Sequence, residues 1–319
     1  METNNELIEI DSELFEKVPR DNKNLNEIVR PSETYFQDAW RRLKQNKLAM
    51  GGLAFVIFVT IAAIIGPMLS KYNYYSQDFK IANQSPSSLH WFGTDKFGRD
   101  QFVRILYGAR ISLSIAYIVS LLNLFIGILY GSISGYAGGN VDNIMMRIVD
   151  VIWSVPSMIY VILLMVILNP PGNPSSDGGI RSIIIAMAIS FWVVMARIVR
   201  SQVMTLKEQE FVLAAKISGA SSMRIILRHL IPNSMGPIIV TMTMSVPNAI
   251  FTEAFLSFLG LGISAPQASW GSLASEALDG YQLFPLQLFF PAMAICLTIL
   301  AFNFLGDGLR DALDPKMRK

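Results

Sequence analysis

The chain has 319 residues, of which 52% are hydrophobic and only 16% are charged, and its mean hydropathy is +0.42. An average soluble domain carries about 25% charged residues. So few charged residues cannot cover the surface of a soluble protein of this length. We therefore expect that lipid is the solvent for most of the chain.

The same composition excludes several classes of function. A net charge of +2 provides no basic field for nucleic acid, so we expect no nucleic-acid partner. The single cysteine, Cys296, excludes an intramolecular disulfide and a thiolate metal cluster, and His90 and His229 leave little for a metal site or a His-based triad. No glycine is followed by lysine, so the chain has no Walker A loop. We expect no catalytic residue, no metal and no cofactor bound by this chain.

The first 34 residues are polar and are predicted to be a disordered tail. In the next segment, residues 35–43, large apolar groups recur at helical intervals beside basic ones. This pattern predicts a helix that lies in the membrane interface with Trp40 at headgroup depth. A solvated helical linker is the alternative.

Six apolar stretches follow, and together they predict an all-α membrane protein with six transmembrane helices. Stretches of about 20 residues suffice to cross a bilayer core of about 30 Å. The fourth is the shortest, and Arg181 and Arg197 at its ends can extend to the interfaces. In chain order the stretches cover residues 49–69, 111–136, 151–168, 182–196, 237–262 and 281–306.

Basic residues predict that both termini are cytoplasmic in a multi-pass protein of the cell membrane. With the termini inside, 19 Lys and Arg residues lie inside and 7 lie outside, in agreement with the positive-inside rule. The exception is the stretch before the second span, where Lys96, Arg99, Arg104 and Arg110 would face outward. Asp95 and Asp100 offset part of that charge.

Glycines recur every four residues in the second span, at Gly127, Gly131 and Gly135. A helix face without side chains lets a second helix approach closely. We therefore expect a packing face there, although the glycines could instead simply loosen the helix.

The loop of residues 200–235, between the fourth and fifth spans, is the longest internal loop. Glu208 and Glu210 favour a helix N-terminus, and Gly219 can adopt the left-handed conformation that ends this helix. Ser221 or Ser222 can cap a second helix that runs to a break at Pro232. The loop is thus predicted to be a helix–turn–helix on the cytoplasmic face.

The first of these two helices carries a small-residue face that is not apolar enough for a core. Such a face, flanked by larger apolar residues, suits insertion into the groove of another protein. An ordinary surface hairpin is the alternative. The small residues are Ala214, Ala215, Ser218 and Gly219, and the flanking residues are Phe211 and Ile217.

This loop resembles the EAA loop of permeases in binding-protein-dependent ABC importers. Glu210, Ala214, Ala215, Gly219 and Ala220, with Pro232 and Asn233 further on, carry the resemblance. In that family the loop is the coupling helix that docks on the ATPase subunit. Here three residues separate the glutamate from the alanine pair, a spacing that the oligopeptide branch of the family tolerates.

Other segments resemble the oligopeptide branch as well, and the resemblance extends from about Trp40 to Lys319. They are residues 90–100, 107–112, 253–262 and 306–315. The resemblance implies the type I ABC importer permease fold. It divides the chain into a tail (1–34), an N-terminal region with the interfacial helix, first transmembrane helix and external loop (35–107), a five-helix core (108–308) and a cytoplasmic tail (309–319).

The resemblance also implies an assembly that imports peptides by alternating access. Its expected partners are a homologous second permease subunit, two ATPase subunits that use ATP, an extracellular peptide-binding protein and membrane lipid. In this assembly the coupling is mechanical, because the chain itself has no nucleotide chemistry.

Glu253 is the only charged residue deep in a predicted span. Such a carboxylate is costly in a membrane and should face a partner or a wet cavity. It could line the peptide pathway, or it could be a helix-end carboxylate near the outer interface that is bonded to backbone.

Three other functions remain as alternatives. The same machinery could carry dipeptides, nickel or another small solute. An ion-coupled secondary transporter would need paired ionisable residues at mid-membrane, and only Glu253 is available. A non-transporting scaffold would leave the helical loop without a purpose.

Overall fold

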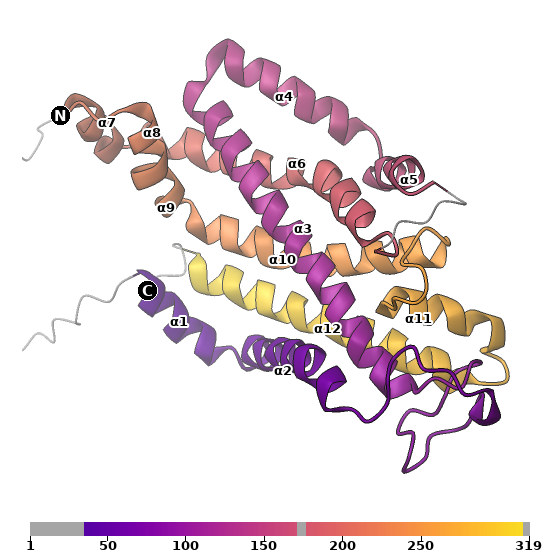
Figure 1. Cartoon of the computed structure of the whole chain (residues 1–319). Helices are drawn as coiled ribbons and strands as arrows, with labels where there is room; N and C mark the ends of the chain where they lie inside the picture. Colours follow the sequence, from indigo (N-terminus) through magenta and orange to yellow (C-terminus); the bar gives the residue numbers. More distant parts are fainter. Residues whose placement is uncertain (1–34, 171–176, 315–319) are drawn as a thin grey trace, which may run out of the picture. The chain divides into compact units, whose positions relative to one another are not determined.

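The computed structural model of the chain describes residues 35–170 and 177–314 (Figure 1). The expected tail 1–34 and the end of the expected tail 309–319 lie outside the described residues. The chain divides into two units, residues 1–38 and 39–319. Of the first unit only residues 35–38 are described, and they are helical. The second unit is described below.

The described residues form helices and connecting loops, with one isolated β-bridge between Thr94 and Asp100. Five helices in the described part of the chain are long and apolar enough to cross a membrane, or six if one bent pair counts as a single span. The predicted all-α membrane fold is confirmed.

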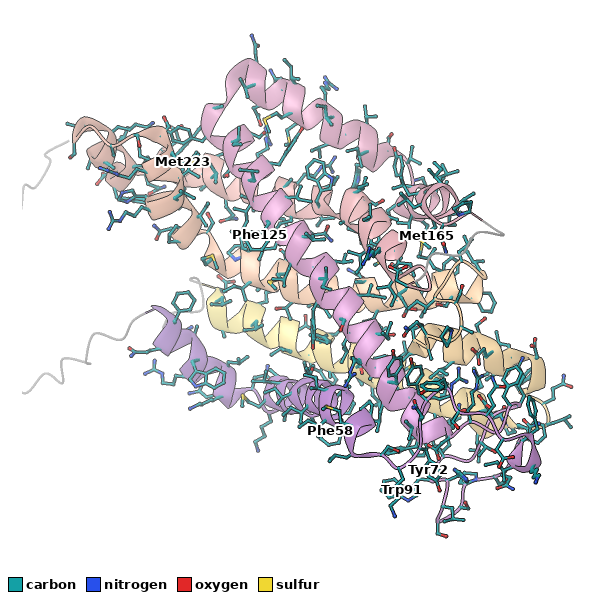
Figure 2. All side chains as sticks on the ribbon, in the orientation of Figure 1. Phe58, Tyr72, Trp91, Phe125, Met165 and Met223 are labelled. Atoms are coloured by element: carbon teal, nitrogen blue, oxygen red, sulfur yellow. The ribbon has the colours of Figure 1, made fainter. Side chains whose placement is uncertain are left out.

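A short helix, α1 (Tyr35–Gln45), precedes the first candidate span, α2 (Lys47–Leu69). Asn46 begins α2, because its side-chain oxygen accepts a hydrogen bond from Ala49 N at 3.1 Å. Many large apolar side chains of α2 are exposed; the labelled Phe58 is 67% exposed (Figure 2). Such exposure suits contact with lipid rather than with water.

Helices α3 (Gln101–Ala137) and α6 (Ile180–Leu206) pack along each other, and the three glycines lie at their contact. A Cβ atom added at Gly127 would lie 2.5 Å from Met195 Cβ, and one at Gly135 would lie 2.8 Å from Arg200 O. No side chain fits in that space, so these positions allow the two backbones to approach closely.

The predicted third span, residues 151–168, contains a sharp break between two helices. Helix α4 (Gly139–Ser154) and helix α5 (Ser157–Leu168) meet at an angle of 83°. Pro156 has no N–H to donate and excludes the helical conformation from the residue before it, so Val155 is extended, with φ −103° and ψ 134°. The proline therefore breaks the helix at that point.

The loop after α6 forms α7 (Glu210–Ile217) and α8 (Ser222–Ile225). The predicted break at Pro232 is wrong, because the chain stays helical through a π turn (Ile226–Leu230) and α9 (Ile231–Asn233). A π turn has a wider hydrogen-bonding ring, which leaves room for a proline ring in the next turn.

The remaining helices close the unit. Helix α10 (Met235–Phe258) is the fifth span, and α12 (Pro285–Leu313) is the sixth and continues past the expected boundary at residue 308. Between them lies the short α11 (Trp270–Ala277), followed by the 3₁₀ turn η5 (Leu278–Gly280). The turn η3 (Phe79–Ile81) lies in the loop before α3.

The main core is built from apolar residues of α3, α6, α10, α11 and α12. Its largest buried side chain is Trp270, which also donates a hydrogen bond from its ring nitrogen to Ile105 O at 3.1 Å. In Figure 1, α7 and α8 lie at one end of α6 and α10, and α11 lies at the other. The fold thus separates the helical loop from the α11 region by the length of the spans.

Candidate functional site

The helical hairpin of residues 209–233 adopts the turn that its glycine predicted. Gly219 has φ +80°, and Ala220 N donates to Ala215 O at 3.0 Å, which completes a left-handed helix end. The Ser221 hydroxyl then accepts a hydrogen bond from Arg224 N at 3.4 Å and caps α8. Local turn and capping interactions therefore end the first helix and begin the second.

The inner face of the hairpin is fixed to the spans. Val212, Ile225 and Leu230 are almost completely buried, and they form one apolar cluster with Val203 of α6 and Ile238 of α10. Because buried side chains are close-packed, the hairpin cannot slide on this surface without disrupting the cluster. The hairpin is thus packed in one cluster with α6 and α10.

The outer face of the hairpin exposes large apolar side chains among polar and charged ones. Ile217 is 88% exposed, and Leu213 and Met223 are also exposed, the last labelled in Figure 2. Exposed apolar patches with a polar rim are typical of a protein interaction site. The other exposed residues of the hairpin before the π turn are Gln209, Glu210, Phe211, Ala214, Lys216, Ser218, Gly219, Ser221, Ser222 and Arg224.

The predicted small-residue face is divided between the two sides of the hairpin. Of its four residues, Ala214, Ser218 and Gly219 are exposed, whereas Ala215 is half-buried against the inner cluster. Ala220, the last residue of the predicted docking segment, is also half-buried against this cluster.

Pro232 and Asn233 lie where the hairpin joins α10. The Asn233 side chain donates a hydrogen bond from Nδ2 to His229 O at 2.6 Å. It therefore provides a donor for a backbone carbonyl of the π turn. The following Ser234 hydroxyl donates to Leu230 O at 2.8 Å. Side chains thus support the irregular helix that connects the hairpin to the fifth span.

Glu253 is completely buried near the end of α10. Its carboxylate accepts hydrogen bonds from three serine hydroxyls: Ser269 at 2.6 Å, Ser112 at 2.9 Å and Ser257 at 3.0 Å. Ser112 belongs to α3, and Ser269 is the N-cap of α11. The carboxylate therefore joins three segments, and it is not among the residues that line the two large cavities of the described chain.

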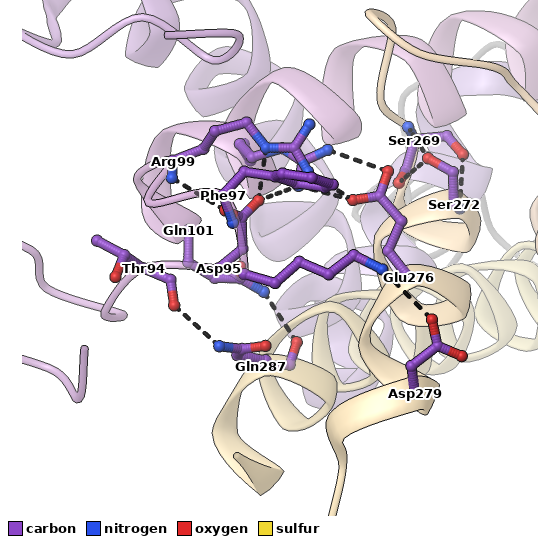
Figure 3. Close-up of polar contacts among 12 residues, drawn as sticks. Thr94, Asp95, Phe97, Arg99, Gln101, Ser269, Ser272, Glu276, Asp279 and Gln287 are labelled. Atoms are coloured by element: carbon purple, nitrogen blue, oxygen red, sulfur yellow. Dashed lines mark hydrogen bonds and ion pairs between the residues drawn. The ribbon is translucent and has the colours of Figure 1, made fainter. Parts of the chain in front are cut away.

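A buried ion-pair network joins the start of α3 to α11, as Figure 3 shows. Asp95 Oδ2 lies 2.6 Å from both Arg99 Nε and Arg104 Nη1. Glu276 Oε2 lies 2.8 Å from Arg99 Nη2 and 2.9 Å from Arg104 Nη1. Two carboxylates thus neutralise two guanidinium groups that are hardly exposed.

This network supplies partners within the protein for two of the basic residues that the sequence places before the second span. Arg99 and Arg104 are structural cations that are paired within the protein. Sequence reasoning identified Asp95 as a compensating charge but missed Glu276, which is 172 residues from Arg104 in the chain. Nothing in the local sequence of Glu276 indicates a pairing over that separation.

The described residues contain no group of three His, Cys, Asp or Glu side chains that could hold a metal ion.

Comparisons with known proteins agree with this arrangement. Residues 127–319, more than half of the chain, match the family described as binding-protein-dependent transport system inner membrane component. The chain belongs to this family. Residues 34–86 match the N-terminal TM domain of oligopeptide transport permease C. The family is a non-catalytic membrane component of ABC transporters.

Individual relatives of this permease cover almost its whole length. It is 50% identical to the oligopeptide transport system permease protein OppC of Bacillus subtilis, over 97% of this chain and 99% of that protein. It is 51% identical to the dipeptide transport system permease protein DppC of the same organism, over 93% and 91%. OppC of Escherichia coli K12 is 42% identical, over 89% and 92%.

A similar fold is found among solved structures. The inward-facing MetNI methionine ABC transporter aligns with a TM-score of 0.51 at 16% identity, over 67% of this permease and 97% of that chain. The type I importer permease fold that the sequence predicted is therefore confirmed.

Proposed function

We propose that this permease subunit imports oligopeptides by alternating access, and that its hairpin receives the force from separate ATPase subunits. Relatives at 50% and 42% identity are named oligopeptide permeases, and they match this chain over most of its length. No catalytic group is needed for this function, because the chemistry of ATP takes place in the partner subunits.

The observation that carries the proposal is the two-sided hairpin. Its inner residues, such as Val212 and Leu230, are buried against the spans, while Ile217 and Met223 are exposed. The positive-inside rule assigns the hairpin to the cytoplasm, where exposed apolar groups need a protein partner. An ATPase subunit that docks there would move α6 and α10 together.

The rest of the assembly follows from the same family. We expect a homologous second permease, two ATPases and an extracellular peptide-binding protein, with both termini of this chain in the cytoplasm. ATP-driven closure of the ATPases would pull the paired hairpins together, and the two permeases would then expose their shared cavity to the opposite side of the membrane.

A dipeptide cargo is the second candidate. The dipeptide permease of Bacillus subtilis is 51% identical to this chain, compared with 50% for the oligopeptide permease. A one-percent difference cannot decide between the two cargoes. Uptake of dialanine and tetra-alanine by the same reconstituted importer would separate them directly.

The proposal is tested by reconstituting the complete importer with Ala214→Trp in this subunit. Ala214 is exposed on α7, so the bulky side chain should leave insertion in the membrane intact while it prevents docking. We expect loss of ATPase co-purification and of tetra-alanine uptake. Gln282→Trp, on the exposed loop between α11 and α12, is the control and should leave both intact. Normal uptake by Ala214→Trp would contradict the docking role.

A further inference from the structure

A cavity of about 490 Å³ lies among α3, α6, α10 and the break between α4 and α5. Ligand pockets in proteins typically measure about 300–1,000 Å³. Its walls combine apolar and polar side chains. The polar ones include Asn123, Ser157, Ser190, Ser245 and Asn248.

Asn123 differs from the other polar residues in this wall. It is only 3% exposed, and neither its Nδ2 nor its Oδ1 atom has a hydrogen-bond partner among the described residues. The hydroxyls of Ser190 and Thr252, in contrast, donate to carbonyls of their own helices. A buried amide with no partner is costly, and native proteins seldom keep one unless something binds to it.

The cavity lies deep in the membrane. Asn123 is at the middle of the uncharged stretch 111–136 and is thus about 18 Å from either end at about 1.5 Å per residue. The helix break at Val155 and Pro156 also lines the cavity. Irregular backbone at membrane depth is tolerated where it lines a cavity, and broken helices at mid-membrane commonly mark the substrate sites of transporters.

We propose that this cavity binds the backbone of the transported peptide and that the Asn123 amide pairs with the N–H and C=O of one of its residues. In an extended peptide the N–H and C=O of one residue point to the same side. An asparagine side chain presents an acceptor and a donor next to each other, so the two can form a pair of hydrogen bonds. Such a pair does not depend on the cargo's side chains, as a permease for peptides of varied sequence requires. This inference rests on the proposed peptide import.

The walls beside Asn123 fit the rest of a peptide. Trp153, Phe191 and Phe251 line the same cavity and provide apolar surface for cargo side chains. Trp153 and Phe251 are more than half exposed, so the cavity opens at the side of this chain. A peptide could therefore reach Asn123 from a pathway shared with the second permease.

The test uses the complete importer in proteoliposomes, with tetra-alanine as the probe and an unchanged binding protein. We compare Asn123→Leu, which removes the amide at similar size, with Asn123→Ala, which leaves more space. Thr298→Val is the matched control, because its hydroxyl is also buried without a partner but lines the other large cavity. Assembly, thermal stability, ATP hydrolysis and the KM of uptake are measured for each variant.

We expect KM for tetra-alanine to rise about tenfold in both Asn123 variants, as the loss of two hydrogen bonds predicts, with ATPase docking unchanged. The control should keep the wild-type KM. If Asn123 were only a structural residue, replacing an unpaired buried amide with Leu would stabilise the protein and leave KM unchanged. That result in either assembled variant would overturn the inference. Failure of the wild-type importer to take up any peptide would instead refute the proposed function.

Discussion

Arg110 of α3 donates hydrogen bonds to two carbonyls at the end of α2, with Nε 3.2 Å from Ala63 O and Nη2 2.7 Å from Ile64 O. Ala63 is four residues before Pro67, and its carbonyl therefore lacks the N–H that would pair with it in an unbroken helix. A guanidinium from the neighbouring span takes the place of that donor.

This relationship predicts the effect of Arg110→Met. Removing the charged donor should lower the free energy of unfolding by about 1.5–3 kcal/mol, because hydrogen bonds that involve a charged group contribute that much. Pro67→Ala restores an N–H for Ala63 O, and it should reduce the cost of Arg110→Met in the double variant. Heat-induced unfolding of the purified subunit measures both. Strictly additive effects would show that the two residues are not coupled.

The buried network predicts unequal effects for two acidic residues of neighbouring turns. Glu276→Gln leaves Arg99 and Arg104 with one carboxylate between them, and it should lower the free energy of unfolding by about 3 kcal/mol. Asp279→Asn is the control, since Asp279 pairs with Lys96 in solvent and its side chain is 81% exposed. Its cost should stay below about 1 kcal/mol. Equal costs in a denaturation experiment would contradict this assignment.

Glu253→Gln should be destabilising without altering cargo recognition. A glutamine places an NH₂ group where one carboxylate oxygen accepts from Ser112 or from Ser269, so a buried hydroxyl loses its acceptor. We expect a loss of about 1–3 kcal/mol in unfolding free energy. Thr243→Val, which removes a hydroxyl bonded within the same helix, should cost less.

Peptide uptake per assembled importer distinguishes this structural role from a place on the pathway. Uptake by Glu253→Gln should match the wild type once the amount of complex is equal. A raised KM with normal stability would contradict the structural role.

The glycine face predicts that α3 and α6 tolerate no added methyl group. Gly127→Ala should lower the free energy of unfolding by about 1–3 kcal/mol, because the new Cβ would lie 2.5 Å from Met195 Cβ and Cγ. Gly51→Ala is the matched control in α2, where a Cβ atom meets nothing within 4 Å. It should be neutral or stabilising by up to about 1 kcal/mol. A neutral Gly127→Ala in thermal unfolding would show that the two helices can move apart freely.

Docking through the outer face predicts a specific phenotype for Ile217→Asp. Ile217 is 88% exposed, so the change should hardly affect folding of this subunit. It should reduce affinity for the ATPase at least tenfold, because a charge replaces an apolar contact. Glu208→Ser, an exposed polar change before the same helix, is the control. Unaltered ATPase affinity in a binding assay would exclude Ile217 from the interface.

Features that depend on neighbours in the chain were predictable. The apolar stretches, the left-handed Gly219 and the Ser221 cap each follow from side-chain chemistry within a few residues. The shape of the third span was only half predictable. Pro156 was visible in the sequence, but an 83° break rather than a mild kink depends on what α4 and α5 pack against.

Features that depend on distant residues were not predictable. Glu253 was recognised as unusual, yet its partners Ser112 and Ser269 belong to other segments, and serines are too common to be singled out. Asn123 gave no signal, since one polar residue in a long apolar helix is ordinary. Its isolation became visible only with the surrounding side chains in place.

The amino-acid sequence by itself determined that this protein is embedded in a lipid bilayer, because uncharged apolar stretches of about 20 residues are stable in the bilayer core. It also determined the hairpin, whose turns are local. Only the tertiary structure decided which polar groups are paired inside the bilayer and which, like the Asn123 amide, have no partner among the described residues. Hydrogen bonds and ion pairs need contact within about 3–4 Å, and contact between distant residues is created by the packing of the helices.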